Sequence, residues 1–392
     1  MSFSKLLDLP HLAVQKILNC MDIIDLLDFS LISKKAFHIA RLHQNKATHC
    51  NLTIRRTFDR KVCVEIVFSD CLKLSWFFSD RPKLLLPGET ISIRTIGGFT
   101  FAQSGKNHVT NSMFVFNANP TEQAFRAVAE HLIRLFPCTM DHIEVDPATF
   151  FPPQSFADWR VVQKCRSLTM RGVTTSKENL ETVINAVQVR DRVEIIGYEG
   201  EEVKCPRLAD LKELTLHVKN ISEDTLHTIK AERIEIGENS FPGRVLGKFL
   251  GQWMNGEKEH VKTLKVSVEH HYFSDRQFSA IFRSVRGNGL KRVDQGATLH
   301  PKYYQYDKTT LYDTDRGHTF RNCNGKLATV LVSDYCFVFL VWNESSPRIT
   351  APRGMYFTVG KKAILIAKHD TPRVYRDDVE ATEIDAEKRV SI

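Results

Sequence analysis

The stretch Leu208-Ala-Asp-Leu-Lys-Glu-Leu-Thr-Leu216 decides which fold we expect. Its leucines stand at positions 208, 211, 214 and 216, a spacing typical of leucine-rich repeats, where each unit supplies one strand and often one helix. Residues 162–170 repeat this spacing, with Val162, Cys165, Leu168 and Met170 at the corresponding positions. In this pattern Cys165 is predicted to be a small core side chain and not a nucleophile.

The alternation of strand and helix extends outward from this stretch. Strands are expected to begin at seven positions spaced by 20 to 30 residues: Ile143, Leu168, Val193, Leu214, Ile234, Leu264 and Leu290. Helices are expected where an N-terminal capping residue or proline precedes apolar residues at helical spacing. These helices begin near Asn119, Thr175, Pro242 and Ser274. Two interpretations stay open: an irregular leucine-rich-repeat-like solenoid, which we favour, and a compact α/β sheet of unrelated topology.

The flanking segments have different patterns. Residues 50–118 favour strands, because partly alternating apolar runs are separated by turn signals such as Gly97-Gly98. The apolar stretch Leu327–Trp342 is too short to cross about 30 Å of hydrocarbon as a helix, so it predicts two buried strands. Residues 346–392 form a C-terminal extension, and its charge-rich end, 377–392, is expected to be disordered.

The composition excludes several classes of protein. The chain has 392 residues, of which 42% are hydrophobic and 26% charged, and a net charge of +8. These values are those of a soluble globular protein and not of a collagen-like, disulfide-scaffold or wholly disordered chain. The nine cysteines form no C-x-x-C pair, and the N-terminus has no secretory pattern. We therefore expect reduced thiols and a cytoplasmic and/or nuclear location, without a membrane span.

The first fifty residues predict three short helices. Val14, Ile17, Leu18 and Met21 recur at helical spacing after Pro10. Asp22 and Ser33 are predicted to cap the two helices that follow. So little chain cannot bury all of its own apolar side chains. Part of this surface is therefore expected to be covered by the rest of the chain or by a partner.

These helices resemble an F-box. The resemblance covers residues 5–45 and lies in Leu6-Leu-Asp-Leu-Pro10, Ile17-Leu18, Asp25-Leu-Leu27 and Ser33-Lys34. It implies docking onto the Skp-type adaptor of an SCF (Skp–cullin–F-box) ubiquitin ligase, and through it onto the cullin. Eight residues stand where family members present adaptor-facing side chains: Leu9, Pro10, Val14, Ile17, Leu18, Leu26, Leu27 and Ser30.

A second resemblance lies further along the chain. Phe249-Leu-Gly-Gln-Trp-Met-Asn-Gly256, followed by Leu264-Lys-Val266, is similar to the type 2 F-box-associated domain of the large nematode F-box families. The expected fold is α+β: a three-helix F-box, a small β region, then an irregular leucine-rich-repeat-like α/β solenoid with a C-terminal β segment. The expected domains are 1–46 (F-box), 50–118 (β-rich connection), 119–345 (F-box-associated) and 346–392 (extension).

The implied function is that of a non-catalytic substrate receptor. It needs no cofactor or metal, and the glycines around Lys248 miss the spacing of a phosphate loop by one residue. Tyr303, Tyr304 and Tyr306 are candidate substrate-binding residues, because tyrosine is favoured at recognition surfaces. The alternative is a leucine-rich-repeat-like interaction module without a ligase role. No known nucleic-acid motif accompanies the mild positive charge, so nucleic acid is not an expected partner.

Overall fold

The structure is a computed structural model that describes most of the chain. The described residues are 9–42, 47–54, 62–68, 72–78, 90–107, 111–115, 122–146, 152–172, 175–200, 202, 208, 211–237, 241–267, 275–286, 303–306, 310–314, 317–333, 335–342, 354–359 and 362–367. The chain forms two compact units, residues 1–205 and residues 206–392, and each is described by itself. The predicted strand near Leu290 and the predicted disordered end lie outside the described residues.

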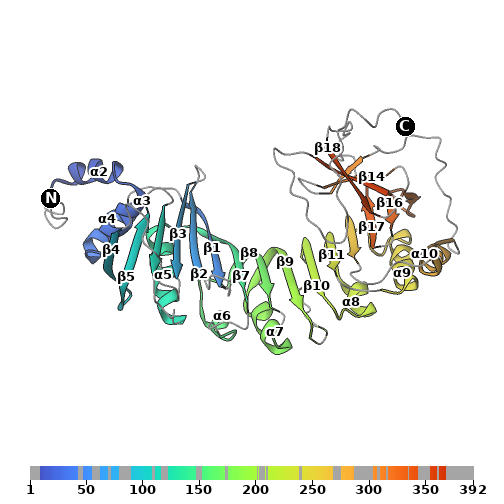
Figure 1. Cartoon of the computed structure of the whole chain (residues 1–392), viewed down its shortest axis with the longest axis horizontal. Helices are drawn as coiled ribbons and strands as arrows, with labels where there is room; N and C mark the ends of the chain where they lie inside the picture. The colour runs from blue at the N-terminus through green and yellow to red at the C-terminus, as the bar shows by residue number, and fades with distance from the viewer. Residues whose placement is uncertain are drawn as a thin grey trace. The chain divides into compact units, whose positions relative to one another are not determined.

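Unit 1 begins with the three expected helices: α2 (His11–Asn19), α3 (Ile23–Ser30) and α4 (Lys34–Leu42). Both predicted caps are confirmed. The Asp22 carboxylate accepts a hydrogen bond from the backbone N–H of Asp25 at 2.7 Å, and the Ser33 hydroxyl accepts one from Ala36 at 3.0 Å. Each cap satisfies a backbone donor that would otherwise lack a partner in the first helical turn. In Figure 1, α3 and α4 lie beside the strands, whereas α2 projects away from them.

The helices are followed by a mixed sheet. Its strands are β1 (Ala47–Ile54), β2 (Val62–Phe68), β3 (Lys73–Phe78), β4 (Thr90–Ile96), β5 (Phe99–Asn107), β6 (Ser112–Val115), β7 (Thr139–Val145), β8 (Lys164–Arg171) and β9 (Gln188–Tyr198). Their order in space is β9-β8-β7-β1-β2-β3-β6-β5-β4. Strands β1, β7, β8 and β9 run parallel, whereas β1, β2 and β3 form an antiparallel meander.

Helices connect the parallel strands and cover one face of this sheet. They are α5 (Glu122–Leu135), α6 (Ser155–Asp158) and α7 (Lys177–Ala186), and Figure 1 shows them on the same side of the strands. Ile143, Leu168 and Val193 are neighbours in register on β7, β8 and β9, and all three are buried. A parallel pair needs such a crossover, so the strand–helix alternation of the sequence produces this core.

The turn between β4 and β5 confirms the predicted Gly97-Gly98 signal. Both glycines have positive φ, +56° and +86°, as a tight hairpin turn of this twist requires. A Cβ at Gly97 would lie 2.8 Å from the Cβ of Ala127 on α5. Glycine is therefore needed at this turn both for its backbone conformation and because a helix packs closely against it.

Unit 2 repeats the alternation and then changes to antiparallel strands. Its elements are β10 (Glu213–Val218), α8 (Glu223–Thr228), β11 (Arg233–Gly237), α9 (Gly243–Met254), β12 (Thr263–Ser267), α10 (Asp275–Arg286), β13 (Tyr303–Gln305), β14 (Thr310–Asp313), β15 (His318–Arg321), β16 (Leu327–Val332), β17 (Cys336–Val341), β18 (Gly354–Val359) and β19 (Lys362–Ala367). One sheet has the order β10-β11-β12-β17-β16-β15, and the other has the order β13-β14-β19-β18.

The fold class is thus mixed α/β with N-terminal helices. Six of the seven expected strand positions lie in β7 to β12, and the stretch Leu327–Trp342 forms the buried strands β16 and β17, as predicted. One cap is corrected: Ser176, and not Thr175, accepts the hydrogen bond from the Asn179 N–H, because Ser176 is the last residue with an extended backbone before α7. A leucine-rich-repeat-like solenoid and the domain boundaries stay predictions.

Candidate functional site

The residues predicted to face an adaptor differ in how deeply they are buried. Pro10 is exposed, and Leu9 and Ile17 are half-buried. The remaining five are buried within the chain itself: Val14, Leu18, Leu26, Leu27 and Ser30. Helix α3 thus directs its apolar residues inward, and the more accessible part of the set lies just before α2 and at Ile17 on α2. The contact of these eight residues with an adaptor stays a prediction.

Polar contacts hold α3 against the rest of unit 1. The guanidinium of Arg94 on β4 donates to both carboxylate oxygens of Asp28, at 2.9 Å from Nε and 3.2 Å from a terminal nitrogen. The Arg94 side chain is only 7% exposed, so this bidentate pair is largely removed from water. On the other side of the helix, the Ser30 hydroxyl lies 3.0 Å from Nε2 of His131 on α5.

His131 lies where α3 and α4 meet α5, and its imidazole ring is neutral. The Ser30 hydroxyl donates its proton to the carbonyl oxygen of Leu27 at 2.6 Å, so His131 donates its Nε2–H to Ser30. The ring of Phe37 on α4 packs against His131 with 5.2 Å between centroids. Burial lowers the pKa of His131 to about 4, and the nearby charge of Arg134 adds to the effect. The histidine therefore links both helices to α5 without carrying charge at neutral pH.

The stability of unit 1 is expected to fall as the pH drops from about 6.5 to 4. In the unfolded chain His131 takes up its proton near 6.5, whereas in the folded chain it does so only near 4, so acid favours unfolding. At about 1.36 kcal/mol per pKa unit the loss at pH 4 is about 3 kcal/mol. Urea denaturation of wild type and His131→Gln across this range should show a shallower dependence on pH in the variant. Equal slopes would contradict the assignment.

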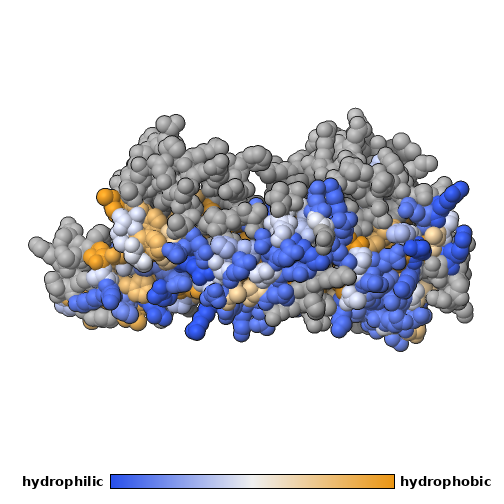
Figure 2. Space-filling view, turned by 90° about the horizontal axis from the view of Figure 1, so that it is seen from below, coloured by the Kyte–Doolittle hydropathy of each residue, from blue (hydrophilic) through white to orange (hydrophobic). Residues whose placement is uncertain are grey.

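The exposed aliphatic side chains gather near the same helices. Among the described residues, the large hydrophobic side chains that are most exposed are Leu12 (73%), Leu42 (73%), Ile93 (72%) and Ile32 (43%). The first helix, the α3–α4 turn, the end of α4 and β4 contribute one each. In the space-filling view of Figure 2, hydrophobic patches stand among mostly hydrophilic residues. Clustered exposed apolar groups are typical of a surface that binds another protein.

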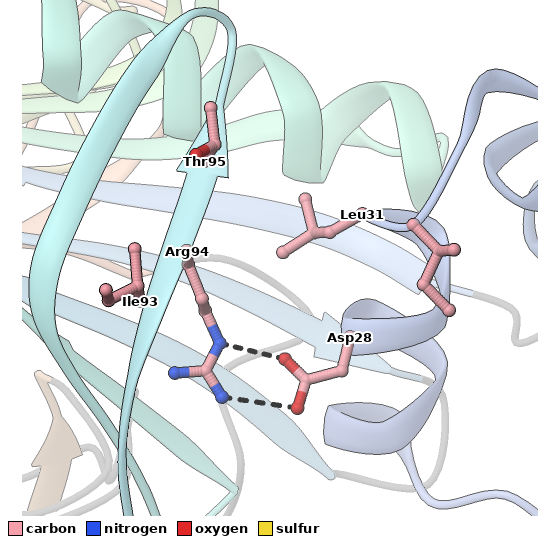
Figure 3. A pocket seen from close by; sticks show the side chains of 6 residues that line it. Asp28, Leu31, Ile93, Arg94 and Thr95 are labelled. Atoms are coloured by element: carbon pink, nitrogen blue, oxygen red, sulfur yellow. Dashed lines mark hydrogen bonds and ion pairs between the residues drawn. The ribbon is translucent and has the colours of Figure 1, made fainter. Parts of the chain in front are cut away.

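A pocket of about 390 Å³ lies between the α3–α4 turn and β4. It is lined by Asp28, Leu31, Ile32, Ile93, Arg94 and Thr95. Figure 3 shows the Arg94 side chain reaching from β4 to the Asp28 carboxylate, with Leu31 beside them. No local pattern in the sequence indicates this site, because Asp28 and Arg94 are 66 positions apart.

In unit 2, the side chain of Glu259 binds the turn between β15 and β16. Its carboxylate accepts hydrogen bonds from the side-chain amides of Asn322 at 2.8 Å and Asn324 at 2.5 Å, and from the ammonium of Lys326 at 3.0 Å. These donors, led by Asn324, lower the pKa of Glu259. The segment after α9 is thereby joined to a hairpin that follows it by more than sixty residues in the sequence.

The end of α9 is shaped to receive the same hairpin. The backbone N–H of Cys323 donates to the carbonyl of Met254 at 2.9 Å. Gly256 has φ +86°, and a Cβ there would approach the Cys323 sulfur to 3.2 Å. The indole of Trp253 is fully buried and packs edge-on against Phe339 of β17, with 5.2 Å between ring centroids. Trp253 and Met254 are thus core residues, and the exposed Asn255 and half-buried Gly256 form the turn that follows α9.

Two regions of the chain match known protein families. Residues 6–48 match the F-box domain. The three N-terminal helices lie within this match. Residues 206–266 match the F-box associated family, so both resemblances are confirmed in the expected order. No solved structure matches the chain.

Two relatives extend over most of the chain. Both are uncharacterized proteins of Caenorhabditis elegans. One is 23% identical over 360 residues, covering 88% of this chain and 80% of the relative. The other is 24% identical over 353 residues, covering 86% and 78%.

The F-box-associated segment contains a buried lysine. Lys258 is 6% exposed, and its ammonium donates to the carbonyl oxygens of His227 at 2.5 Å and Ile229 at 3.0 Å. These carbonyls lie at the C-terminal end of α8, where carbonyl groups lack helical partners and the helix dipole favours a cation. Burial lowers the pKa of Lys258. The lysine therefore caps α8 and joins it to the α9–β12 loop.

The candidate substrate-binding tyrosines lie on and beside β13. Tyr304 packs edge-on against Trp342 with 5.1 Å between centroids, and burial raises its pKa. Tyr306 packs against Tyr312 at 5.6 Å. Both side chains are half-buried, and that of Tyr303 lies outside the described part of the chain. Their role in substrate binding stays a prediction.

Among the described residues, no group of three or more His, Cys, Asp or Glu side chains is placed to hold a metal ion. No helix in the described ranges is long and apolar enough to span a membrane.

Proposed function

We propose that this chain is the substrate receptor of an SCF-type ubiquitin ligase. The F-box holds the Skp-type adaptor and, through it, the cullin, while the F-box-associated region holds a protein substrate. The observation that supports this most is the F-box match at residues 6–48 together with the exposed side chains of Leu12, Ile32 and Leu42 within it. A few apolar anchors of this kind carry most of the energy of an interface.

The proposed receptor is a non-catalytic subunit. The assembled ligase brings a substrate lysine close to a ubiquitin-charged enzyme, and the gain in rate comes from proximity. The F-box-associated region, including Tyr303, Tyr304 and Tyr306 and a solenoid-like arrangement of its strands, is the proposed substrate surface. We place this activity in the cytoplasm and/or nucleus, where the free cysteines would stay reduced.

Co-expression of the full chain with a Skp-type adaptor is expected to give a stable one-to-one complex. Leu12→Asp should weaken adaptor binding by roughly thirtyfold, because an anchor residue contributes about 2 kcal/mol. Leu12 is exposed, so the variant keeps its fold, unlike a deletion of residues 1–46, which would uncover the junction with α5. Affinity is measured by isothermal titration calorimetry.

The matched control is Gln123→Asp, an exposed position in the first turn of α5. It introduces the same charge in unit 1 away from the F-box and should bind like wild type. A folded, monomeric full chain that forms no complex would overturn the proposal. It would favour the second candidate, an interaction module without a ligase role, whose N-terminal helices only cap the following domain.

A further inference from the structure

The pocket between the F-box and β4 has an exposed apolar rim. Ile32 belongs to the F-box and Ile93 to β4, outside residues 6–48, and both line the pocket. Ile93 is 72% exposed although β4 is a strand of a packed sheet. In the strand order, β4 is the last strand of its sheet, so it lies at an edge that a partner can reach.

The pocket is held open by the ion pair beneath it. Arg94 and Asp28 join β4 to α3 by two hydrogen bonds, as Figure 3 shows, and Leu31 and Ile32 follow α3 directly. His131 fastens the same helix to α5. Because both walls are fixed to one another, a partner binds without the loss of conformational entropy that ordering them would cost.

The exposed rim of the pocket, which Ile32 and Ile93 form, favours an apolar occupant. The charges of Asp28 and Arg94 neutralise one another, so a charged side chain would lose its hydration without meeting a free counter-charge. An aliphatic side chain would instead cover Ile32 and Ile93 and displace water from both. A volume of about 390 Å³ accommodates one such side chain with part of its neighbouring backbone.

We infer that the Skp-type adaptor extends its contact beyond the F-box onto β4 and inserts an apolar side chain between Ile32 and Ile93. This inference rests on the proposed function. The adaptor is the occupant because Ile32 belongs at once to the exposed apolar face of the F-box and to the pocket. A protein that covers Ile32 also covers one wall of the pocket. Adaptor binding would then use β4 of unit 1 as well as residues 6–48.

The test replaces Ile93 and measures adaptor affinity of the full chain by isothermal titration calorimetry. Ile93→Thr keeps a β-branched side chain, and with it the strand preference, but places a hydroxyl at the pocket rim. We expect about tenfold weaker binding of the purified adaptor. Ile93→Val keeps an aliphatic rim and should bind within twofold of wild type. Gln123→Asp is the control for an exposed change elsewhere in unit 1, and circular dichroism verifies the fold of each variant.

The outcomes separate this inference from the proposed function. If wild type binds the adaptor, Leu12→Asp weakens it and Ile93→Thr binds as tightly as wild type, the extension onto β4 is wrong while the F-box assignment stands. If Ile93→Val is as weak as Ile93→Thr, no apolar rim contact exists and the inference again fails. If wild type does not bind, the proposed function fails and the inference fails with it.

Discussion

Replacing Trp253 by alanine is expected to lower the free energy of unfolding of unit 2 by about 3–5 kcal/mol, the usual cost of removing a large buried aromatic side chain. Trp253 is fully buried on α9 and stacks edge-on with Phe339, which also meets Phe249 at 5.6 Å. The variant leaves a cavity between the helix and β17. Urea denaturation followed by circular dichroism measures the change, because the signal does not depend on the deleted indole.

Two further variants test whether the loss of stability comes from the missing buried ring. Trp253→Phe should cost less than half as much, because the indole N–H of Trp253 makes no hydrogen bond to any described residue and the ring is retained. Lys248→Ala, at an exposed position of the same helix, should stay within about 0.5 kcal/mol of wild type. An alanine variant at Trp253 as stable as the Lys248 variant would show that α9 does not pack as described.

Replacing Arg94 by methionine is expected to destabilise unit 1 by about 3 kcal/mol. Removing one member of a buried ion pair leaves the other without compensation, which costs about 3–5 kcal/mol when burial is complete. Asp28 is 23% exposed, so the lower end of that range applies. The loss should be largest at α3, and hydrogen exchange of its amides, together with urea denaturation, locates and measures it.

The same substitution at an exposed pair is the control. Arg171→Met removes an ion pair with Glu144 whose arginine is 44% exposed, and should cost at most about 1 kcal/mol. Replacing both Arg94 and Asp28 by apolar residues should recover most of the stability, because no unpaired charge remains. If Arg94→Met and Arg171→Met cost the same, Arg94 does not fix the F-box helices to β4.

Local signals in the sequence were sufficient for individual elements. Asp22 and Ser33 predict their caps because a cap depends only on residues within one helical turn. The strands near Leu168 and Leu214 follow from apolar spacing for the same reason. At α7 two neighbouring hydroxyl residues could both cap, and the pattern does not decide between Thr175 and Ser176.

The candidate docking site depends on contacts that a linear pattern does not contain. In β4 the alternation of isoleucine with polar residues predicts that one face is apolar and the other polar. In the structure, Arg94 and Ile96 are buried and Ile93 is exposed, and a register shift between Ser92 and Arg94 interrupts the pairing with β5. No single-sequence signal reveals that shift, and therefore the pocket and its ion pair were missed.

The spacing of the F-box contacts along the chain has a consequence during synthesis. Ser30 meets His131 across 101 positions of sequence. At about 5–20 residues per second, His131 leaves the ribosome roughly 5–20 s after Ser30. Until then α3 has no α5 to cover it, and Leu26 and Leu27, which are fully buried in the finished unit, face solvent or another protein. The nascent F-box thus passes through an interval in which its apolar surface is larger than in the completed protein.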